Sequence, residues 1–267
     1  MKVPGSARIT ALYRYPVKGL SPEKMESADV SAGDYWPGDR LFAIENGPTG
    51  FDPARPDQRP KTWFLMLMRH EALARLKTRF DDGNGTLSIE GDGVEPLCSE
   101  IGSESGRAEI EAFFKHYMGE ALRGAPRLLS ASDRFRFTDS RSGFVSLINR
   151  ASVDALAALI NAPVDPLRFR GNIYVEGLPP HTELDWPAGT RLVAPGGVVF
   201  EVVKRIGRCA ATNVDPATGQ RDLEIPRALM EAYGHMDCGV YLRILEGGRV
   251  AARDDLEIAR GSANPCG

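Results

Sequence analysis

The residue in this sequence with the clearest chemical potential is Cys209, and three cations, Lys204, Arg205 and Arg208, lie close to it along the chain. A nearby cation favours the thiolate, which is the form of cysteine that acts as a nucleophile or binds a soft metal. On a regular strand Arg208 would point to the opposite face, so Arg205 or a residue distant in sequence is the expected neighbour. A lone cysteine on a strand can equally be a small buried hydrophobe, and the local pattern leaves both interpretations open.

A sharply specified turn follows Cys209. Asp215 suits the first position of a turn, Pro216 fixes φ at the second, and Gly219 supplies a residue with positive φ. This pattern is typical of a hairpin connection. The sequence therefore places Cys209 on a strand at the mouth of a hairpin.

Three further cations are candidates to meet Cys209 in space. Lys18 follows a proline in a predicted loop, and Arg40 and Arg170 each lie close to a glycine at a predicted strand end. Such positions can bring positive charge together around an anion, although each residue alone is typical of a solvated surface charge. Together with Cys209 they would suit a ligand that has a phosphate at one end and a soft metal at the other.

Composition excludes several classes of function. The chain has 267 residues, of which 42% are hydrophobic, and this is enough for one large or two modest domains with a buried core. Its formal charge of -3 gives no basic field for nucleic acid or an anionic membrane. The sequence shows no signal peptide and no apolar run of about 18 residues, so we expect a cytoplasmic protein.

The common catalytic and metal motifs are absent from the sequence. It contains no G-x-G-x-x-G after a strand, no Walker A motif and no G-x-S-x-G elbow. Its four cysteines are far apart and form no C-x-x-C pair, which argues against a zinc ribbon, an iron–sulfur ligand set or a disulfide framework. Any redox centre must be held in another way.

The first half of the chain predicts short strands with two helices. Alternation and turn residues indicate strands at 7–15, 25–30 and 40–45. The Pro- and Gly-rich segment 46–61 reads as a loop that is either functional or a mobile excursion. Helical spacing of apolar residues predicts amphipathic helices over 64–80 and 107–118. Short strands with frequent turns favour a small barrel.

The second half is again rich in predicted strands, and the pattern restarts near residue 125. Helices are expected at 152–161 and between Pro226 and Gly234, the favoured start and stop residues. A final hairpin is expected around Gly247 and Gly248. The other strands are expected at 127–130, 172–176, 191–194 and 198–206. We therefore predict a mixed, mostly β fold with two β-barrel-like domains, 1–124 and 125–267, and peripheral helices.

The order and spacing of several short segments resemble those of MOSC-domain proteins, named for the molybdenum cofactor sulfurase C-terminal domain, with the N-terminal β-barrel domain that commonly precedes it. The resemblance covers nearly the whole chain. Within this family the sequence most resembles the bacterial relatives of the mitochondrial amidoxime-reducing component. The segments that carry it are YPVKGL (15–20), GDR (38–40), DSRSGF (139–144), FRGNI (169–173) and RCAATNVDPATG (208–219).

The resemblance implies a site for the molybdenum cofactor, with molybdopterin, and not for pyridoxal phosphate. Cys209 matches the molybdenum ligand, and the positions that match contacts to the rest of the cofactor are Lys18, Gly19, Arg40, Arg141, Ser142 and Arg170, with Ser140 as the substitute if the loop alignment is shifted by one residue. Gly19 stands where many relatives have serine, so only a backbone N–H is expected there.

The implied activity is reduction of N-hydroxylated or related N-oxygenated small molecules at the metal. Some bacterial relatives carry an added ferredoxin-like domain, and this sequence ends at Gly267 without one. Electrons are therefore expected from a separate ferredoxin-like or flavoprotein-like donor. The alternative function is a carrier, in which Cys209 holds a persulfide or the fold stores the cofactor.

Overall fold

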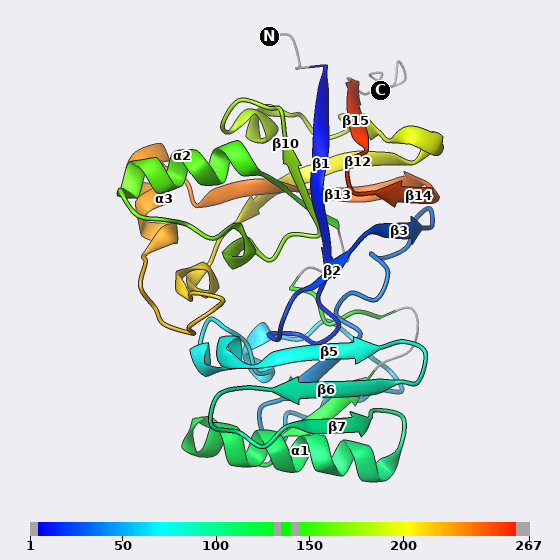
Figure 1. Ribbon diagram of the computed structural model, residues 1–267, viewed down its shortest axis with the longest axis vertical. Coiled ribbons are helices and arrows are strands. Elements are labelled where there is room, and N and C mark those ends of the chain that lie inside the picture. The colour runs from blue at the N-terminus through cyan, green and yellow to red at the C-terminus, as the bar shows by residue number, and fades with distance from the viewer. Residues whose placement is uncertain (1–4, 131–134, 140–144, 260–267) are drawn as a thin grey trace.

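The largest element of the fold is a closed barrel of seven strands, in the upper part of Figure 1. The computed structural model describes residues 5–130, 135–139 and 145–259. Hydrogen bonding runs around the barrel in the order β10-β9-β13-β12-β11-β15-β1, and β1 closes the ring by pairing with β10. The strands are β1 (Ser6–Arg14), β9 (Val145–Asn149), β10 (Ile173–Glu176), β11 (Arg191–Val193), β12 (Val199–Gly207), β13 (Asp237–Glu246) and β15 (Asp255–Ala259).

The barrel combines the beginning of the chain with its second half. β1 is antiparallel to β10 on one side and to β15 on the other, while the short strand β2 (Glu23–Met25) pairs with the end of β1. Inward-facing residues of β1 such as Ile9 and Leu12 are completely buried in the barrel core. The strand itself was predicted, but regular alternation does not place Ile9 and Leu12 on one face. The register shifts between Ile9 and Ala11, and this irregularity brings Leu12 to the same side as Ile9, while Ala11 and Tyr13 pack against another cluster.

Three small sheets complete the β structure. β4 (Phe42–Glu45) pairs with β8 (Arg127–Ser130), and β3 (Ser27–Val30) pairs with β14 (Gly248–Ala251). A three-stranded sheet of β5 (Lys77–Asp81), β6 (Thr86–Glu90) and β7 (Leu97–Glu100) forms the lower part of Figure 1 with the helix α1. The prediction of a mostly β fold with a barrel and peripheral helices is confirmed.

In the described ranges three α-helices pack outside these sheets: α1 (Glu104–Met118), α2 (Arg150–Ile160) and α3 (Ile225–Tyr233). Ser103 caps α1 by accepting a hydrogen bond from the Gly106 N–H. α3 begins with Pro226 in its first turn and ends at Gly234 with φ of 73°. All three helices were predicted at these places in the sequence.

The predicted helix over 64–80 is wrong. This segment contains an extended stretch, a 3₁₀ helix at Glu71–Arg75 and then β5. Its apolar residues, including Leu65, Leu73 and Phe80, are buried in one cluster with α1 and the three-stranded sheet. The apolar residues of this segment recur about every 3.6 residues. This spacing correctly predicted that they are buried on one side, but not the backbone conformation, because turns and a strand can bury the same residues.

The predicted final hairpin around residues 247 and 248 is also wrong. β14 follows β13 after a tight connection, but it pairs with β3 from the first part of the chain. Gly248 has φ of 147° and lies against Val198, and an added Cβ at Gly247 would lie 2.7 Å from the Val30 carbonyl oxygen. The glycines therefore allow close approach of another segment rather than a two-residue hairpin.

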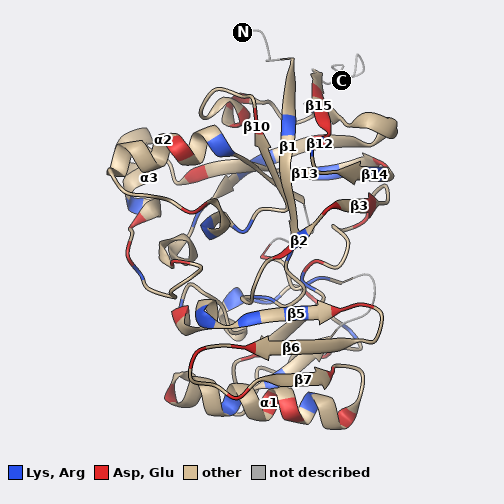
Figure 2. Cartoon of the chain, viewed as in Figure 1, with Lys and Arg blue, Asp and Glu red and all other residues tan. Residues whose placement is uncertain are grey.

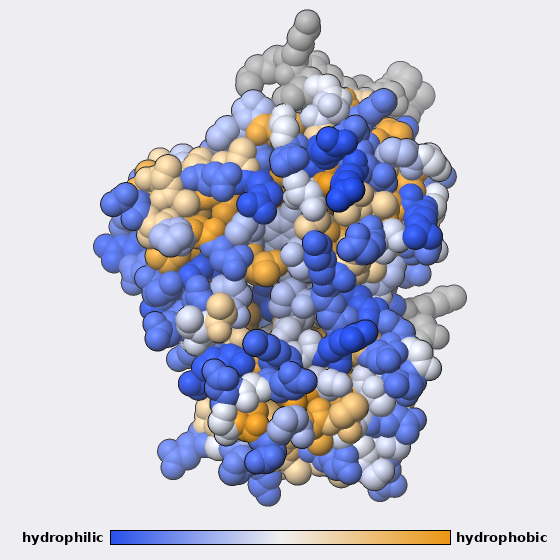
Figure 3. Space-filling model, viewed as in Figure 1, coloured by the Kyte–Doolittle hydropathy of each residue, from blue (hydrophilic) through white to orange (hydrophobic). Residues whose placement is uncertain are grey.

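The face of the molecule drawn in Figure 3 is mainly hydrophilic. In Figure 3 apolar side chains appear in separate groups over the α2–α3 side and over the three-stranded sheet. Acidic and basic residues alternate along α1, as Figure 2 shows, so this helix exposes both signs of charge. Among the described residues, no helix combines the length and apolarity needed to cross a bilayer.

Candidate cofactor site

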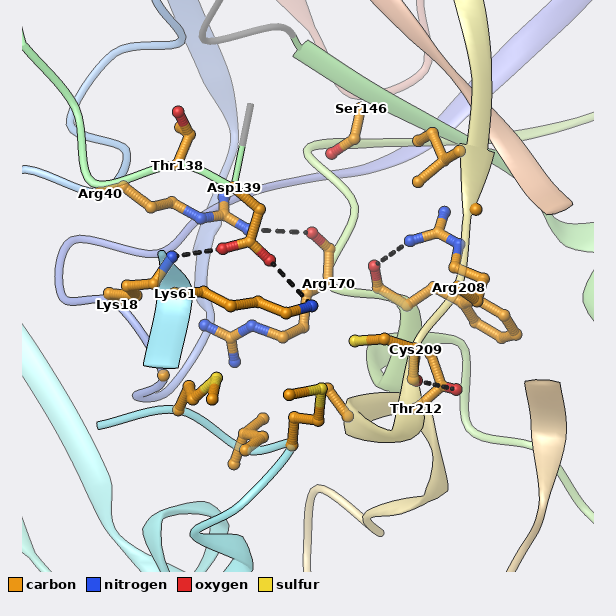
Figure 4. A pocket seen from close by; sticks show the side chains of 18 of the residues that line it. Lys18, Arg40, Lys61, Thr138, Asp139, Ser146, Arg170, Arg208, Cys209 and Thr212 are labelled. Atoms are coloured by element: carbon orange, nitrogen blue, oxygen red, sulfur yellow. Dashed lines mark hydrogen bonds and ion pairs between the residues drawn. The ribbon is translucent and has the colours of Figure 1, made fainter. Parts of the chain in front are cut away.

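One cavity of about 470 Å³ brings together the cysteine and the three cations that the sequence singles out. Its walls come from the loop after β1, residues 66–68, residues 137–139, the 3₁₀ helix at Pro166–Phe169 and the end of β12. In Figure 4 a group of cations and Asp139 occupies one end, and Cys209 lies at the other. We call these the cation end and the thiol end.

Positive charge dominates the walls. The described residues that line the cavity include two carboxylates, Asp39 and Asp139, and eight cations: Lys18, Arg40, Lys61, Arg168, Arg170, Lys204, Arg205 and Arg208. The whole chain, in contrast, has a formal charge of -3. Concentration of one sign of charge in a low-dielectric cavity focuses the field there and attracts a ligand of the opposite sign.

The guanidinium groups of Arg40 and Arg170 lie over the ring of Tyr15. Their carbon atoms are 4.4 and 4.2 Å from the ring centroid, a cation–π arrangement. Both arginines adopt the left-handed backbone region, with φ of 49° for Arg40 and 50° for Arg170. This region is unfavourable for residues with a Cβ, and such strain is concentrated at functional sites.

Asp39 holds Arg40 in place. Its carboxylate accepts hydrogen bonds from the Arg40 Nη1 with both oxygens and from the Tyr15 backbone N–H at 2.8 Å. The Arg40 Nη2 donates to the Arg170 carbonyl at 3.3 Å, which connects the first part of the chain with the segment before β10. Burial acts to lower the pKa of Arg40, but Asp39 outweighs it, so this pKa is raised and the charge is secure.

Arg170 has less compensation. Its Nη1 donates to the Leu20 carbonyl at 2.8 Å, while its Nη2 is buried without a hydrogen-bond partner in the described part of the structure. Burial, and then the charge of Arg40, lower the pKa of Arg170 to about 10. A buried donor without an acceptor is costly, so this atom is well suited to an anionic ligand.

Lys18 is buried at the same end, where its Nζ donates to the Phe137 carbonyl at 2.9 Å and to Asp139 at 2.5 Å. Lys61 lies 3.9 Å from the other oxygen of Asp139, as the dashed lines of Figure 4 show. Burial lowers the pKa of Lys18 despite the ion pair. Burial acts to raise the pKa of Asp139, but Lys18 and Lys61 outweigh it, so this pKa is lowered.

Gly19 contributes backbone rather than side chain. It has φ of 84°, and an added Cβ would lie 2.9 Å from the Leu65 carbonyl oxygen. A serine at this position would be strained both by its backbone and by this contact. The glycine therefore allows the loop after β1 to approach residues 65–66. Residues 66–68 form part of the cavity wall.

Cys209 lies beyond the end of β12, so the prediction that it is on the strand is wrong. It precedes a 3₁₀ helix at Ala210–Asn213, and its carbonyl accepts hydrogen bonds from the N–H and the hydroxyl of Thr212. The side chain is partly exposed, and Figure 4 shows its sulfur directed into the cavity. The thiol is therefore accessible to a ligand while its backbone is fixed.

The neighbours of Cys209 differ from the strand-based expectation. Arg208 also lines the cavity and donates to the carbonyls of Phe169 and Cys238. Alternation does not govern Arg208 because β12 ends at Gly207. Arg205 lines the cavity as well, although its Nε donates to the Leu184 carbonyl at 2.6 Å.

The predicted turn after Cys209 is present and is held by a buried arginine. The Asp215 carboxylate accepts from the backbone N–H groups of Ala217 and Thr218, and Gly219 has φ of 69°. Arg168, with a side chain 1% exposed, donates to Asp215 at 2.9 Å and to both oxygens of Asp222. A bidentate guanidinium fixes both position and orientation, so Arg168 sets the location of this turn.

Two family models match the chain and together span most of it. Residues 6–121 match the MOSC N-terminal beta barrel domain, and residues 133–257 match the MOSC domain. The chain is a MOSC-domain protein. The strand β1, at the start of the first match, belongs to the barrel formed by strands of the second. The predicted division after residue 124 falls between the two matches and stays a prediction.

Curated relatives of this MOSC-domain protein include molybdenum cofactor sulfurases. The one from Caenorhabditis elegans is 27% identical over 89% of this chain and 33% of its own length. The one from Anopheles gambiae is 35% identical over 45% of this chain and 16% of its own length. The chain therefore spans a third or less of these relatives.

Solved structures with low similarity include the YuaD protein from Bacillus subtilis, at 13% identity and a TM-score of 0.44 over 95% of both chains. Another is YiiM from Geobacillus stearothermophilus, at 18% identity and a TM-score of 0.36 over 45% of this chain and 56% of that one.

The cavity contains some predicted residues and several that sequence reasoning missed. It brings together Lys18, Gly19, Arg40, Arg170 and Cys209. Arg141, Ser142 and the substitute Ser140 lie outside the described residues. The missed residues hold these groups in place: Asp39, Asp139 and Arg168 line the cavity, and Tyr15 lies behind Arg40 and Arg170. Arg208 was expected on the opposite face but also lines the cavity. The sequence signal that could have found the two carboxylates is their position, since Asp39 lies in the segment GDR (38–40) and Asp139 begins the segment DSRSGF (139–144).

Proposed function

We propose that the MOSC-domain protein binds the molybdenum cofactor in this cavity and reduces N-hydroxylated or related N-oxygenated small molecules. The observation that carries the proposal is the pairing, within one cavity, of an accessible thiol with a strongly cationic end. A ligand with a soft metal at one end and a phosphate at the other matches this arrangement. The similarity to molybdenum cofactor sulfurases supports the same class of ligand.

The cation end fits the phosphate of such a cofactor. Within the described residues Arg170 offers a buried donor without a partner, and the buried Lys18 and the partly buried Arg40 add two charges at the same end. Gly19 also lines the cavity, and its backbone lies close to residues 65–66. These residues would hold the anion without rearrangement of the surrounding chain, because their positions are already fixed by Asp39, Asp139 and Tyr15.

The thiol end would supply Cys209 as a protein ligand to molybdenum. The bound metal would supply oxygen-atom removal, in which the substrate N–OH takes up two electrons and two protons and yields N–H and water. The protein holds the thiol just after β12, and Arg208 and Thr212 line the same cavity. The two electrons would come from a separate ferredoxin-like or flavoprotein-like protein.

A metal analysis tests this proposal. Protein is produced in hosts with and without pterin synthesis, as wild type, as Cys209→Ala and as Cys98→Ala, the last being an exposed cysteine on β7. Molybdenum is expected only with the pterin, with loss of metal or reductase activity in Cys209→Ala and no change in Cys98→Ala. The proposal fails if Cys209→Ala retains full molybdenum content and full reduction of an N-hydroxylated amidine with a chemical electron donor.

A second function, sulfur transfer or cofactor storage, is favoured by one observation. The curated relatives carry the name sulfurase, and the accessible Cys209 could hold a persulfide. Labelling of Cys209 by a persulfide-selective reagent, in protein without molybdenum, would support this carrier. Molybdenum in the wild type without reductase activity would support storage.

A further inference from the structure

Arg221 connects two segments from different halves of the chain beside Cys209. Its guanidinium donates to the Ala210 carbonyl at 3.0 Å, directly after the cysteine. The same group donates to the carbonyls of Leu67 at 2.9 Å and Met68 at 2.8 Å. It also forms an ion pair with Glu71 at 3.1 Å.

The two segments that Arg221 connects both line the cavity. Leu67 and Met68 belong to its N-terminal wall, and Cys209 belongs to the facing thiol end. Behind this connection the turn lies tightly against the N-terminal part, since an added Cβ at Gly219 would be 3.0 Å from the Glu71 carbonyl oxygen. Arg221 therefore holds the thiol end against the opposite wall.

Other contacts between the two segments are mainly apolar. Val214 is buried in the cluster that contains Leu65 and Leu73, and Ala211 packs on the edge of that cluster. Burial of apolar surface stabilises contact but has little directional preference. A planar guanidinium with several donors fixes distance and orientation. The orientation of the segment 209–213 relative to residues 67–68 thus depends on Arg221.

Arg221 is itself fixed by the turn. It forms an isolated β-bridge with Val214, and the adjacent Asp222 is held by the buried Arg168. The chain of contacts runs from Arg168 through the turn to Arg221 and then to the carbonyl that follows Cys209. Arg168 is joined to Asp222 by hydrogen bonds, Asp222 to Arg221 by the peptide bond, and Arg221 to the Ala210 carbonyl by a hydrogen bond.

We propose that Arg221 is a positioning residue for Cys209, which keeps the thiol in a restricted orientation between the two walls of the cavity. The proposal rests on the proposed function only for the identity of the group that the thiol binds. Placement of the thiol can be measured in protein without cofactor, so failure of one proposal is distinguishable from failure of the other.

The test measures the rate at which Cys209 reacts with an aromatic disulfide reagent in full-length, cofactor-free protein. Cys98 is exposed and Cys266 lies outside the described residues, so both are replaced by serine in every variant. Loss of hydrogen bonds to a charged, partly exposed group predicts a rate increase of about five- to tenfold in Arg221→Gln. Arg221→Lys should give a smaller increase. The ammonium keeps the positive charge, but it cannot reproduce the several fixed hydrogen bonds of the planar guanidinium.

Two controls separate positioning from general loss of structure. Arg227 on α3 is more exposed and pairs with Glu224 and Glu231, so Arg227→Gln should leave the Cys209 rate unchanged. Cys238 is 2% exposed and should remain unreactive in all variants. An unchanged Cys209 rate in Arg221→Gln, or equal increases at Cys209 and Cys238, would overturn the proposal.

Discussion

The two ends of the cavity are built in different ways. At the cation end, Lys18, Arg40 and Arg170 are held by ion pairs, by an aromatic ring and by a strained left-handed backbone. At the thiol end, Cys209 depends on a short 3₁₀ helix and on hydrogen bonds to its backbone. The first arrangement concentrates like charges and is unfavourable without an anion, whereas the second positions a single thiol.

We expect the two ends of the cavity to have different roles in binding a ligand. A charged cluster that is fixed before binding gives affinity for an anion, because little reorganisation is needed when the ligand arrives. A single thiol adds little general affinity but determines which metal is bound and how it reacts.

The largest effect is expected at the thiol end. Cys209→Ser should lower reductase activity per bound pterin by more than about 100-fold, since loss of a ligand exceeds the 10- to 100-fold loss typical of residues that only orient ligands. Pterin content should fall much less, because the cation end is intact. Activity is measured together with pterin and molybdenum content in the same sample. Equal loss of pterin and activity would contradict these different roles.

The next effect concerns the support of the cation end. Asp39→Asn removes the charge that compensates Arg40, and the side chains of these residues are 7% and 16% exposed. We expect the free energy of unfolding to fall by about 3 kcal/mol and the melting temperature by about 6–12 °C. Denaturant unfolding and calorimetry of cofactor-free protein measure both. Asp52→Asn, at an exposed pair with Arg55, is the matched control and should change little.

A smaller effect is expected from removal of the Arg170 charge, which forms no ion pair with a carboxylate in the described part of the chain. Arg170→Gln should weaken binding of inorganic phosphate to cofactor-free protein by about 10- to 100-fold, the range for a charge-assisted hydrogen bond. Calorimetric titration measures the affinity, and Arg191→Gln on β11 is the control. Unchanged phosphate affinity in Arg170→Gln would exclude this residue from the anion site.

The smallest effect is a difference in acid stability. Lys18 and Lys61 overcome the effect of burial and lower the pKa of Asp139 below its ordinary value of 3.8, so its stabilisation is complete above that value. It is lost as the pH falls through the lowered pKa. Unfolding of wild type and Asp139→Asn is therefore compared from pH 6 to pH 3. The stability difference should be constant down to about pH 4 and should shrink below it; a difference that grows on acidification would contradict this sign.

Much of the fold could be predicted from the sequence because local signals agreed with tertiary structure. The strand-forming residues of β1, the apolar spacing of α1 and the turn residues around Asp215 each predicted the type of element that the structure contains. The segment 64–80 could not be predicted, since its apolar residues face one core from a turn, a 3₁₀ helix and a strand. The pairing of β14 with β3 depends on contacts about 220 residues apart, which no local pattern encodes.

The site was predictable to a similar degree. Lys18, Arg40, Arg170 and Cys209 were found as residues, and the structure adds the reason that they converge. The left-handed backbone conformation of Arg40 and Arg170 could not be predicted, because a glycine lies close to each of them and glycine is the residue expected to have positive φ. The supporting carboxylates were missed since an aspartate beside a basic residue is also common on solvated surfaces.

The pairing of β1 with both β10 and β15 has a consequence for biosynthesis. During translation the first strand of the barrel emerges long before its partners, and the ring cannot close until residue 259 has left the ribosome. Until then the side of β1 that pairs with β15 is an open edge, which is a site for association with other chains. The barrel should therefore mature late, and deletion of β1 should leave β10 and β15 as two open edges rather than a smaller intact domain.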